Sequence, residues 1–224
     1  NRAGPFGILQ PVADGLKLFF KEEIIPNFSS KFLFILGPSL AMLTAIMTGA
    51  VVPWGNTVYF FDREISLQIA DVNVGILYIF AVVSIGVYGI MIGGWASNNK
   101  YSLPGAMRSG AQIVSYELSA GLSILTIVIL TGSLKITDIV NAQADGWWIF
   151  KGHLPVIISF IIFIIAVTAE TNRAPFDLAE AESELTAGFH TEYSGMKFAL
   201  FFLAEYVNIF IVCAIGATLF LGGW

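Results

Sequence analysis

Three glutamates lie inside, or directly at the end of, long apolar stretches of this 224-residue sequence: Glu117, Glu170 and Glu205. An ionisable side chain in a membrane is energetically costly, and it usually faces the interior of a helix bundle or a water-filled cavity. Desolvation and mutual repulsion prevent such carboxyls from all being ionised at once, so protons can pass among them near neutral pH. The three acids therefore predict a proton relay. The structural alternative is that each acid lies in an interfacial ring or pairs with a nearby base, as Glu170 could with Arg173.

A second group of acids follows Glu170 in the segment AETNRAPFDLAEAESEL, which spans 169–185. Its members are Asp177, Glu180, Glu182 and Glu184. Asp177 and Glu180 have the spacing of a capping box, so we expect a helix to begin at Asp177 and to end at Gly188. Like charges four residues apart weaken an isolated helix. Two interpretations stay open: a solvated acidic loop, or a helix whose negative potential has a use, which its position between two acid-bearing stretches favours.

Few residues are available for other kinds of chemistry. The single cysteine, Cys213, has no partner for a disulfide and cannot form a thiolate metal site alone. The two histidines, His153 and His190, fall in expected loops, which disfavours a bis-histidine haem within the membrane. There is no GxGxxG after a strand, no P-loop and no CxxC. We therefore expect the chain itself to bind no nicotinamide nucleotide, ATP or iron–sulfur cluster, and any redox centres to belong to partner proteins.

The elements that must position the acids are membrane spans. The sequence is 56% hydrophobic and 12% charged, with a mean hydropathy of +0.78, whereas soluble domains carry about 25% charged residues. A bilayer core needs roughly 20 apolar residues in helical form. We predict an all-α, polytopic helix bundle that forms a single membrane domain over 1–224, with five spans at about 32–52, 72–96, 113–134, 154–169 and 198–224. On these bounds Glu117 lies roughly 6 Å, and Glu205 roughly 10 Å, inside its helix end.

Basic residues predict the orientation of the spans. One side carries Arg2, Lys17, Lys21, Lys31, Lys100, Arg108, Arg173 and Lys197, and the other carries Arg63, Lys135 and Lys151. The positive-inside rule assigns the first side, with the N-terminal segment 1–31 and the acidic loop 170–197, to the cytoplasm or the mitochondrial matrix. Within that segment an amphipathic helix over 9–25, ended by Pro26, either lies on the membrane surface or covers a partner. We see no signal peptide and expect flanking sequence at the ends.

Three segments of the sequence resemble one protein family. They are NRAGPFGILQPVADGLKLFFKE, GWASNNKYSLPGAMRSGAQIVSYE and the acidic segment AETNRAPFDLAEAESEL. The family is the membrane subunit of respiratory complex I that is called the H subunit in bacteria and subunit 1 in mitochondria, and the resemblance covers essentially the whole chain. It implies one further span before these five and two after them. It also implies that the chain forms the membrane-side floor of a chamber where quinone is reduced, beside antiporter-like membrane subunits. FMN and iron–sulfur clusters would lie in partner subunits of a hydrophilic arm.

The resemblance also implies roles for single residues. Glu117 in SYE, Glu170 in AETNR and Glu205 in LAEY match the family's buried acids, and the acidic segment matches its acidic loop, on the path of protons. Arg2, Gln10, Asp14 and Arg173 match positions beside the quinone chamber. Beyond membrane lipid, quinone and the other subunits we expect no partner such as nucleic acid. The expected location is the bacterial cytoplasmic membrane or, alternatively, the mitochondrial inner membrane. Two other functions stay open: a subunit of a related membrane-bound hydrogenase, or a stand-alone proton or cation transporter.

Overall fold

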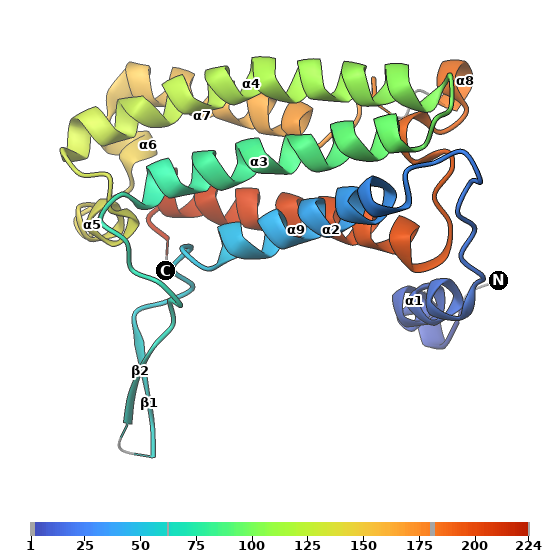
Figure 1. The fold of residues 1–224 in the computed structure, drawn as a ribbon. Helices are drawn as coiled ribbons and strands as arrows, with labels where there is room; N and C mark the ends of the chain where they lie inside the picture. Colours follow the sequence, from blue (N-terminus) through green and yellow to red (C-terminus); the bar gives the residue numbers. More distant parts are fainter. Residues whose placement is uncertain (1–2, 62, 180–181, 224) are drawn as a thin grey trace.

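The computed structural model describes residues 3–61, 63–179 and 182–223. Within this part of the chain, five helices are long and apolar enough to cross a membrane. They are α2 (Lys31–Gly49), α3 (Gly75–Ala96), α4 (Ser102–Thr131), α7 (His153–Glu170) and α9 (Gly195–Phe220). Figure 1 shows them running side by side as one bundle. The predicted all-α, multi-pass membrane architecture is confirmed.

One span differs substantially from its expected bounds, whereas the other four begin and end within four residues of them. α4 begins at Ser102, eleven residues before the expected start at 113. This extension is rich in small and polar residues, and its buried face includes Ser102, Gly105, Ser109 and Gln112. The charge of Arg108 interrupts the uncharged run, so the expected span left this segment out. The buried face of the segment packs on the loop before α9, and this packing keeps the segment helical. Glu117 is therefore fifteen residues from the helix start, roughly 22 Å along its axis rather than 6 Å.

Short elements cap the two ends of the bundle (Figure 1). One end carries η1 (Pro5–Gly7), α1 (Gln10–Phe20), α8 (Glu182–Leu185) and η2 (Gly188–His190). The other end carries α5 (Ile136–Asn141), α6 (Trp148–Lys151) and a hairpin of β1 (Thr57–Phe60) and β2 (Arg63–Ser66), in which Thr57 pairs with Ser66. We refer to these two ends of the bundle as the α1 end and the hairpin end. The hairpin projects away from the bundle, and the sequence reasoning did not predict it.

The predicted helix start at Asp177 is wrong. The amide of Phe176 donates to the carbonyl of Arg173 at 2.7 Å and closes a turn, Asp177 has no regular structure, and a further turn covers Leu178 and Ala179. Ala179 is fully buried in the apolar core of the α1 end. The chain therefore folds inward here to bury Ala179, and the next helix among the described residues is α8 (Glu182–Leu185).

Small residues bring α2 and α3 into close contact. A methyl group added at Gly37 would lie 2.9 Å from the Cα of Gly93, and one added at Gly89 would lie 2.9 Å from the amide nitrogen of Ala41. Such close backbone approach is a common way for membrane helices to pack, since no hydrophobic effect drives their association within lipid. Further toward the hairpin end, a methyl group added at Gly86 would lie 2.9 Å from the hydroxyl oxygen of Thr44. These contacts fix the position of the polar face of α2.

A buried tyrosine joins the loop before α9 to α2. Pro38 lies inside α2 and has no N–H, so the carbonyl of Phe34 has no helical donor. The hydroxyl of Tyr193 donates to this carbonyl at 3.1 Å, and its ring stacks on Phe34 with centroids 4.1 Å apart. Burial raises the pKa of the Tyr193 phenol, which keeps it protonated as a donor. The loop is thereby fixed against the part of α2 that needs a hydrogen bond.

Candidate functional site

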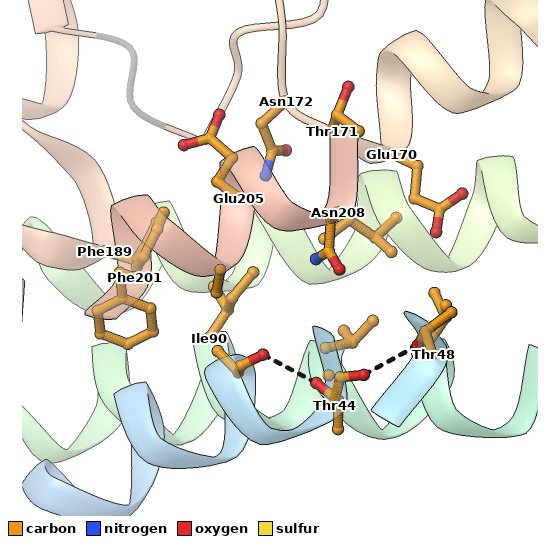
Figure 2. A pocket seen from close by; sticks show the side chains of 16 residues that line it. Thr44, Thr48, Ile90, Glu170, Thr171, Asn172, Phe189, Phe201, Glu205 and Asn208 are labelled. Atoms are coloured by element: carbon orange, nitrogen blue, oxygen red, sulfur yellow. Dashed lines mark hydrogen bonds between the residues drawn. The ribbon is translucent and has the colours of Figure 1, made fainter. Parts of the chain in front are cut away.

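A cavity of about 70 Å³ lies between α2, α3, α7 and α9. The polar side chains that line it come from three of these helices and from the residues that follow α7 (Figure 2). They are Thr44 and Thr48 of α2, Glu170 with Thr171 and Asn172 at the end of α7, and Glu205 and Asn208 of α9. A cavity needs only about 10–15 Å³ of such volume to hold one water molecule when polar partners are present. The cavity is therefore large enough for several waters.

Two of the three predicted relay acids, Glu170 and Glu205, line this cavity. Glu170 is the last residue of α7, and Glu205 lies ten residues into α9. Figure 2 shows Asn208 between them. Tertiary packing thus brings together acids that are 35 positions apart in the sequence.

Glu117 faces a different space. Its side chain lines an apolar groove of about 600 Å³ between α3 and α4, beside residues such as Phe80 and Leu118. Its carboxyl forms a hydrogen bond with the hydroxyl of Ser84. It also lies close enough to the carboxyl of Glu170 for the two to repel each other when both are ionised. Glu170 therefore lies near Glu117 and also lines the cavity that Glu205 lines, whereas Glu117 lines only the groove.

Arg173 pairs with Glu205, a partner that the sequence reasoning had not assigned to it. The guanidinium Nε lies 3.4 Å from a carboxylate oxygen of Glu205, and the guanidinium carbon lies 4.8 Å from the ring centroid of Tyr206. The Glu205 side chain is 19% exposed and that of Arg173 is 42% exposed. A contact of this kind between a guanidinium and a carboxylate is charge-assisted. Arg173 thus joins the segment after α7 to α9 at Glu205.

Gln112 holds the start of the acidic loop within the bundle. Its buried amide nitrogen donates to the carbonyl of Ala169 at 2.7 Å and to that of Phe176 at 2.8 Å. Because Gln112 lies ten residues into α4, the end of α7 is beside the middle of the bundle rather than at its surface. The sequence reasoning missed Gln112 because it placed the span's start one residue later.

The acids of the acidic segment do not gather around the cavity as far as the structure describes them. Asp177 and Glu184 are exposed and do not line it, and Glu184 pairs with Arg108 at 2.9 Å on the surface. The backbone of Glu182 lies in α8. Glu180 falls outside the described residues.

The N-terminal residues predicted to lie beside a quinone chamber are at the α1 end. In α1 the amide of Gln10 donates to the carboxylate of Asp14 at 3.1 Å and accepts from the backbone of Ala3 at 3.0 Å. Arg2 lies outside the described residues. The chain after α1 is attached to α9 by an ion pair between Glu23 and the buried Lys197, which the sequence reasoning did not identify.

The described residues contain no group of three or more histidine, cysteine, aspartate or glutamate side chains that could hold a metal ion. Carboxyl groups such as those of Glu117, Glu170 and Glu205 are able to hold and release protons.

Comparisons with known proteins agree over the whole chain. A family profile described as NADH dehydrogenase matches residues 1–224. The chain is 56% identical to an NADH-quinone oxidoreductase H subunit, numbered 1, of Cytophaga hutchinsonii and covers 65% of that protein, with 100% of the chain aligned. It is 58% identical to the NADH-quinone oxidoreductase H subunit of Flavobacterium psychrophilum, again over 100% of the chain, and covers 64% of that protein. The chain thus spans slightly less than two thirds of the length of these relatives. It belongs to the NADH dehydrogenase family.

Proposed function

We propose that the chain is the quinone-chamber membrane subunit of a proton-pumping NADH:quinone oxidoreductase, in which it couples quinone reduction to proton translocation. The observation that carries this proposal is the set of three neighbouring acids from three helices, Glu117, Glu170 and Glu205, around one polar cavity and one apolar groove. The relatives, which are named as subunits of NADH-quinone oxidoreductase, support the same function.

In this proposal the acids act in the order Glu205, Glu170, Glu117. Glu205 is nearest to Arg173, whose partly exposed guanidinium links it to the acidic loop. A change of charge in the adjoining chamber alters the pull of Arg173 and hence the proton occupancy of Glu205. The proton then passes through the cavity to Glu170 and on to Glu117, whose groove faces neighbouring antiporter-like subunits. Acids that interact this closely titrate as one coupled group, so neutralising one changes the others.

The remaining parts of the enzyme are assigned to partners. FMN and iron–sulfur clusters in the subunits of a hydrophilic arm supply electrons from NADH, and quinone is the substrate at their interface with this chain. The acidic segment, in which Asp177 and Glu184 are exposed, contacts this arm. A role beside the chamber is assigned to Arg2, Gln10, Asp14 and Arg173. The α1 end faces the cytoplasm, and the host membrane is the bacterial cytoplasmic membrane.

Purification of the tagged chain from its native membrane tests the proposal. It should bring FMN and iron–sulfur partners with NADH:quinone reductase activity, whereas nickel would indicate a hydrogenase and an isolated chain would indicate a transporter. Glu117→Gln and Glu205→Gln should assemble, retain electron transfer from NADH to an artificial acceptor, and lose most quinone reduction and proton uptake in vesicles. Glu170→Gln should have a similar effect. Parental pumping in all three assembled variants would refute the relay.

A further inference from the structure

Asn208 lies between two acids of the proposed relay and lines the same cavity (Figure 2). It is three residues after Glu205 on α9, so both side chains lie on one face of the helix. Its amide points into the cavity between Glu205 and Glu170 (Figure 2). Asn208 is half-buried, and within the part of the chain that the structure describes its amide forms no hydrogen bond to protein. A polar group that lines a cavity can bond to water, and a cavity of about 70 Å³ admits water.

Two threonines provide acceptors on the opposite wall. The hydroxyl of Thr44 donates to the carbonyls of Leu40 and Ala41, both at 3.0 Å, and that of Thr48 donates to the carbonyl of Thr44 at 2.9 Å (Figure 2). Their protons are therefore committed to their own helix, and only their oxygen lone pairs face the cavity. Gly86 leaves the space for the Thr44 hydroxyl, since a methyl group there would lie 2.9 Å from its oxygen.

The walls between these polar groups are apolar. Val83, Val87 and Ile90 of α3 line the same cavity and offer no side-chain hydrogen bond. The side chains that offer hydrogen bonds to a water inside are the acids, the amide of Asn208, the threonine oxygens and the polar end of α7. Such a lining orders waters along the polar side of the cavity.

We propose that Asn208, assisted by Thr44 and Thr48, is a positioning residue that holds a short chain of waters between Glu205 and Glu170. This inference rests on the proposed function and names how the proton crosses the cavity. The protonated carboxyl of Glu205 gives its proton to the first water, and each water passes one proton onward. The last water gives a proton to the ionised carboxylate of Glu170. Because Asn208 can donate and accept, it holds a water in place without itself being ionised.

The test compares side chains of similar size in the assembled enzyme, reconstituted in vesicles. Asn208→Leu removes the amide and nearly keeps the volume, and Asn208→Ser keeps a polar group and leaves room for one more water. We expect Asn208→Leu to slow quinone-coupled proton uptake by about tenfold, equivalent to ~1.4 kcal/mol on the barrier, and to increase the solvent deuterium isotope effect. Asn208→Ser should restore most of the rate. Electron transfer from NADH to an artificial acceptor should be unchanged in both.

A double variant and its matched control test the same inference if Asn208→Leu does not assemble. Thr44→Val combined with Thr48→Val removes both acceptors at constant size and should also slow proton uptake. The matched control is Thr168→Val, because the Thr168 hydroxyl also bonds within its own helix, at 2.7 Å to Ile164, but does not line the cavity. The control should pump like the parent.

Several outcomes would overturn the inference. They are parental uptake in Asn208→Leu, equal losses in Asn208→Leu and Asn208→Ser, or a high-resolution map of the parent enzyme with no water beside the Asn208 amide. Glu205→Gln, measured in the same vesicles, separates this failure from that of the proposed function. If Glu205→Gln abolishes uptake while Asn208→Leu does not, the relay stands and the water chain fails. If Glu205→Gln also pumps like the parent, both fail.

Discussion

Replacing Tyr193 with phenylalanine removes one hydroxyl and leaves one backbone carbonyl of α2 without a hydrogen bond. That carbonyl belongs to Phe34, whose helical donor is missing because Pro38 has no N–H. The Tyr193 hydroxyl also lies 3.3 Å from the carbonyl of Gly93, but this oxygen already accepts from the amide and the hydroxyl of Ser97. Only the Phe34 carbonyl therefore depends on Tyr193.

The size of the effect follows from burial. Phe34 is 0% exposed and Tyr193 is 6% exposed, so water does not reach the carbonyl after the substitution. A buried acceptor left unsatisfied costs about 1–3 kcal/mol. The phenylalanine ring keeps the stacking on Phe34, so apolar contact is not lost. For a chain of this length the unfolding temperature should fall by roughly 2 to 12 °C.

Thermal unfolding of the purified protein in detergent, followed by tryptophan fluorescence, measures this change. The matched control is Tyr78→Phe, because the Tyr78 hydroxyl also bonds to a carbonyl of α2, that of Met47, at 3.3 Å. That carbonyl keeps a second donor, the amide of Ala50 at 3.2 Å, so the control should shift the temperature little. Equal shifts in the two variants, or none in Tyr193→Phe, would refute the argument that Pro38 creates the need for Tyr193.

Three further predictions follow from other contacts. Arg173→Lys loses the planar guanidinium that meets Glu205 and should lower quinone reduction while electron transfer to an artificial acceptor is retained; equal loss in both assays would indicate failed assembly. Gly37→Ala pushes a methyl group against the backbone of α3 and should destabilise the protein by about 1–3 kcal/mol, measured by thermal unfolding, whereas Gly15→Ala on α1, which meets no neighbouring atom, should not. The hydrogen bond from Lys135, at 2.6 Å, lowers the pKa of Asp71, so this pair stabilises the fold above the ordinary carboxyl pKa and loses the effect as the pH falls through the lowered value. Unfolding temperatures measured against pH should show this loss in the parent and not in Asp71→Asn.

The apolar composition and the long uncharged runs were enough to predict that the chain lies in a membrane, that it is helical, and approximately where the five spans fall. A bilayer imposes these features directly, since a spanning helix must have a certain length and must satisfy its own backbone. The same runs identified Glu117, Glu170 and Glu205, because an acid within such a run is conspicuous. The family was equally readable from AETNRAPFDLAEAESEL and the two other segments.

Only the tertiary structure decided which faces of the helices meet. The spans are apolar on nearly all sides, so their sequences carry little amphipathic signal to indicate which residues turn inward. The meeting of Glu170 with Asn208, the pairing of Arg173 with Glu205 and the anchoring of the loop by Gln112 depend on how α4, α7 and α9 are rotated against one another. Close contacts between small residues likewise fix α2 against α3, and the hydrogen bond from Tyr193 to the carbonyl of Phe34 fixes the loop before α9 against α2. These interactions join positions far apart in the chain, and no local pattern encodes them.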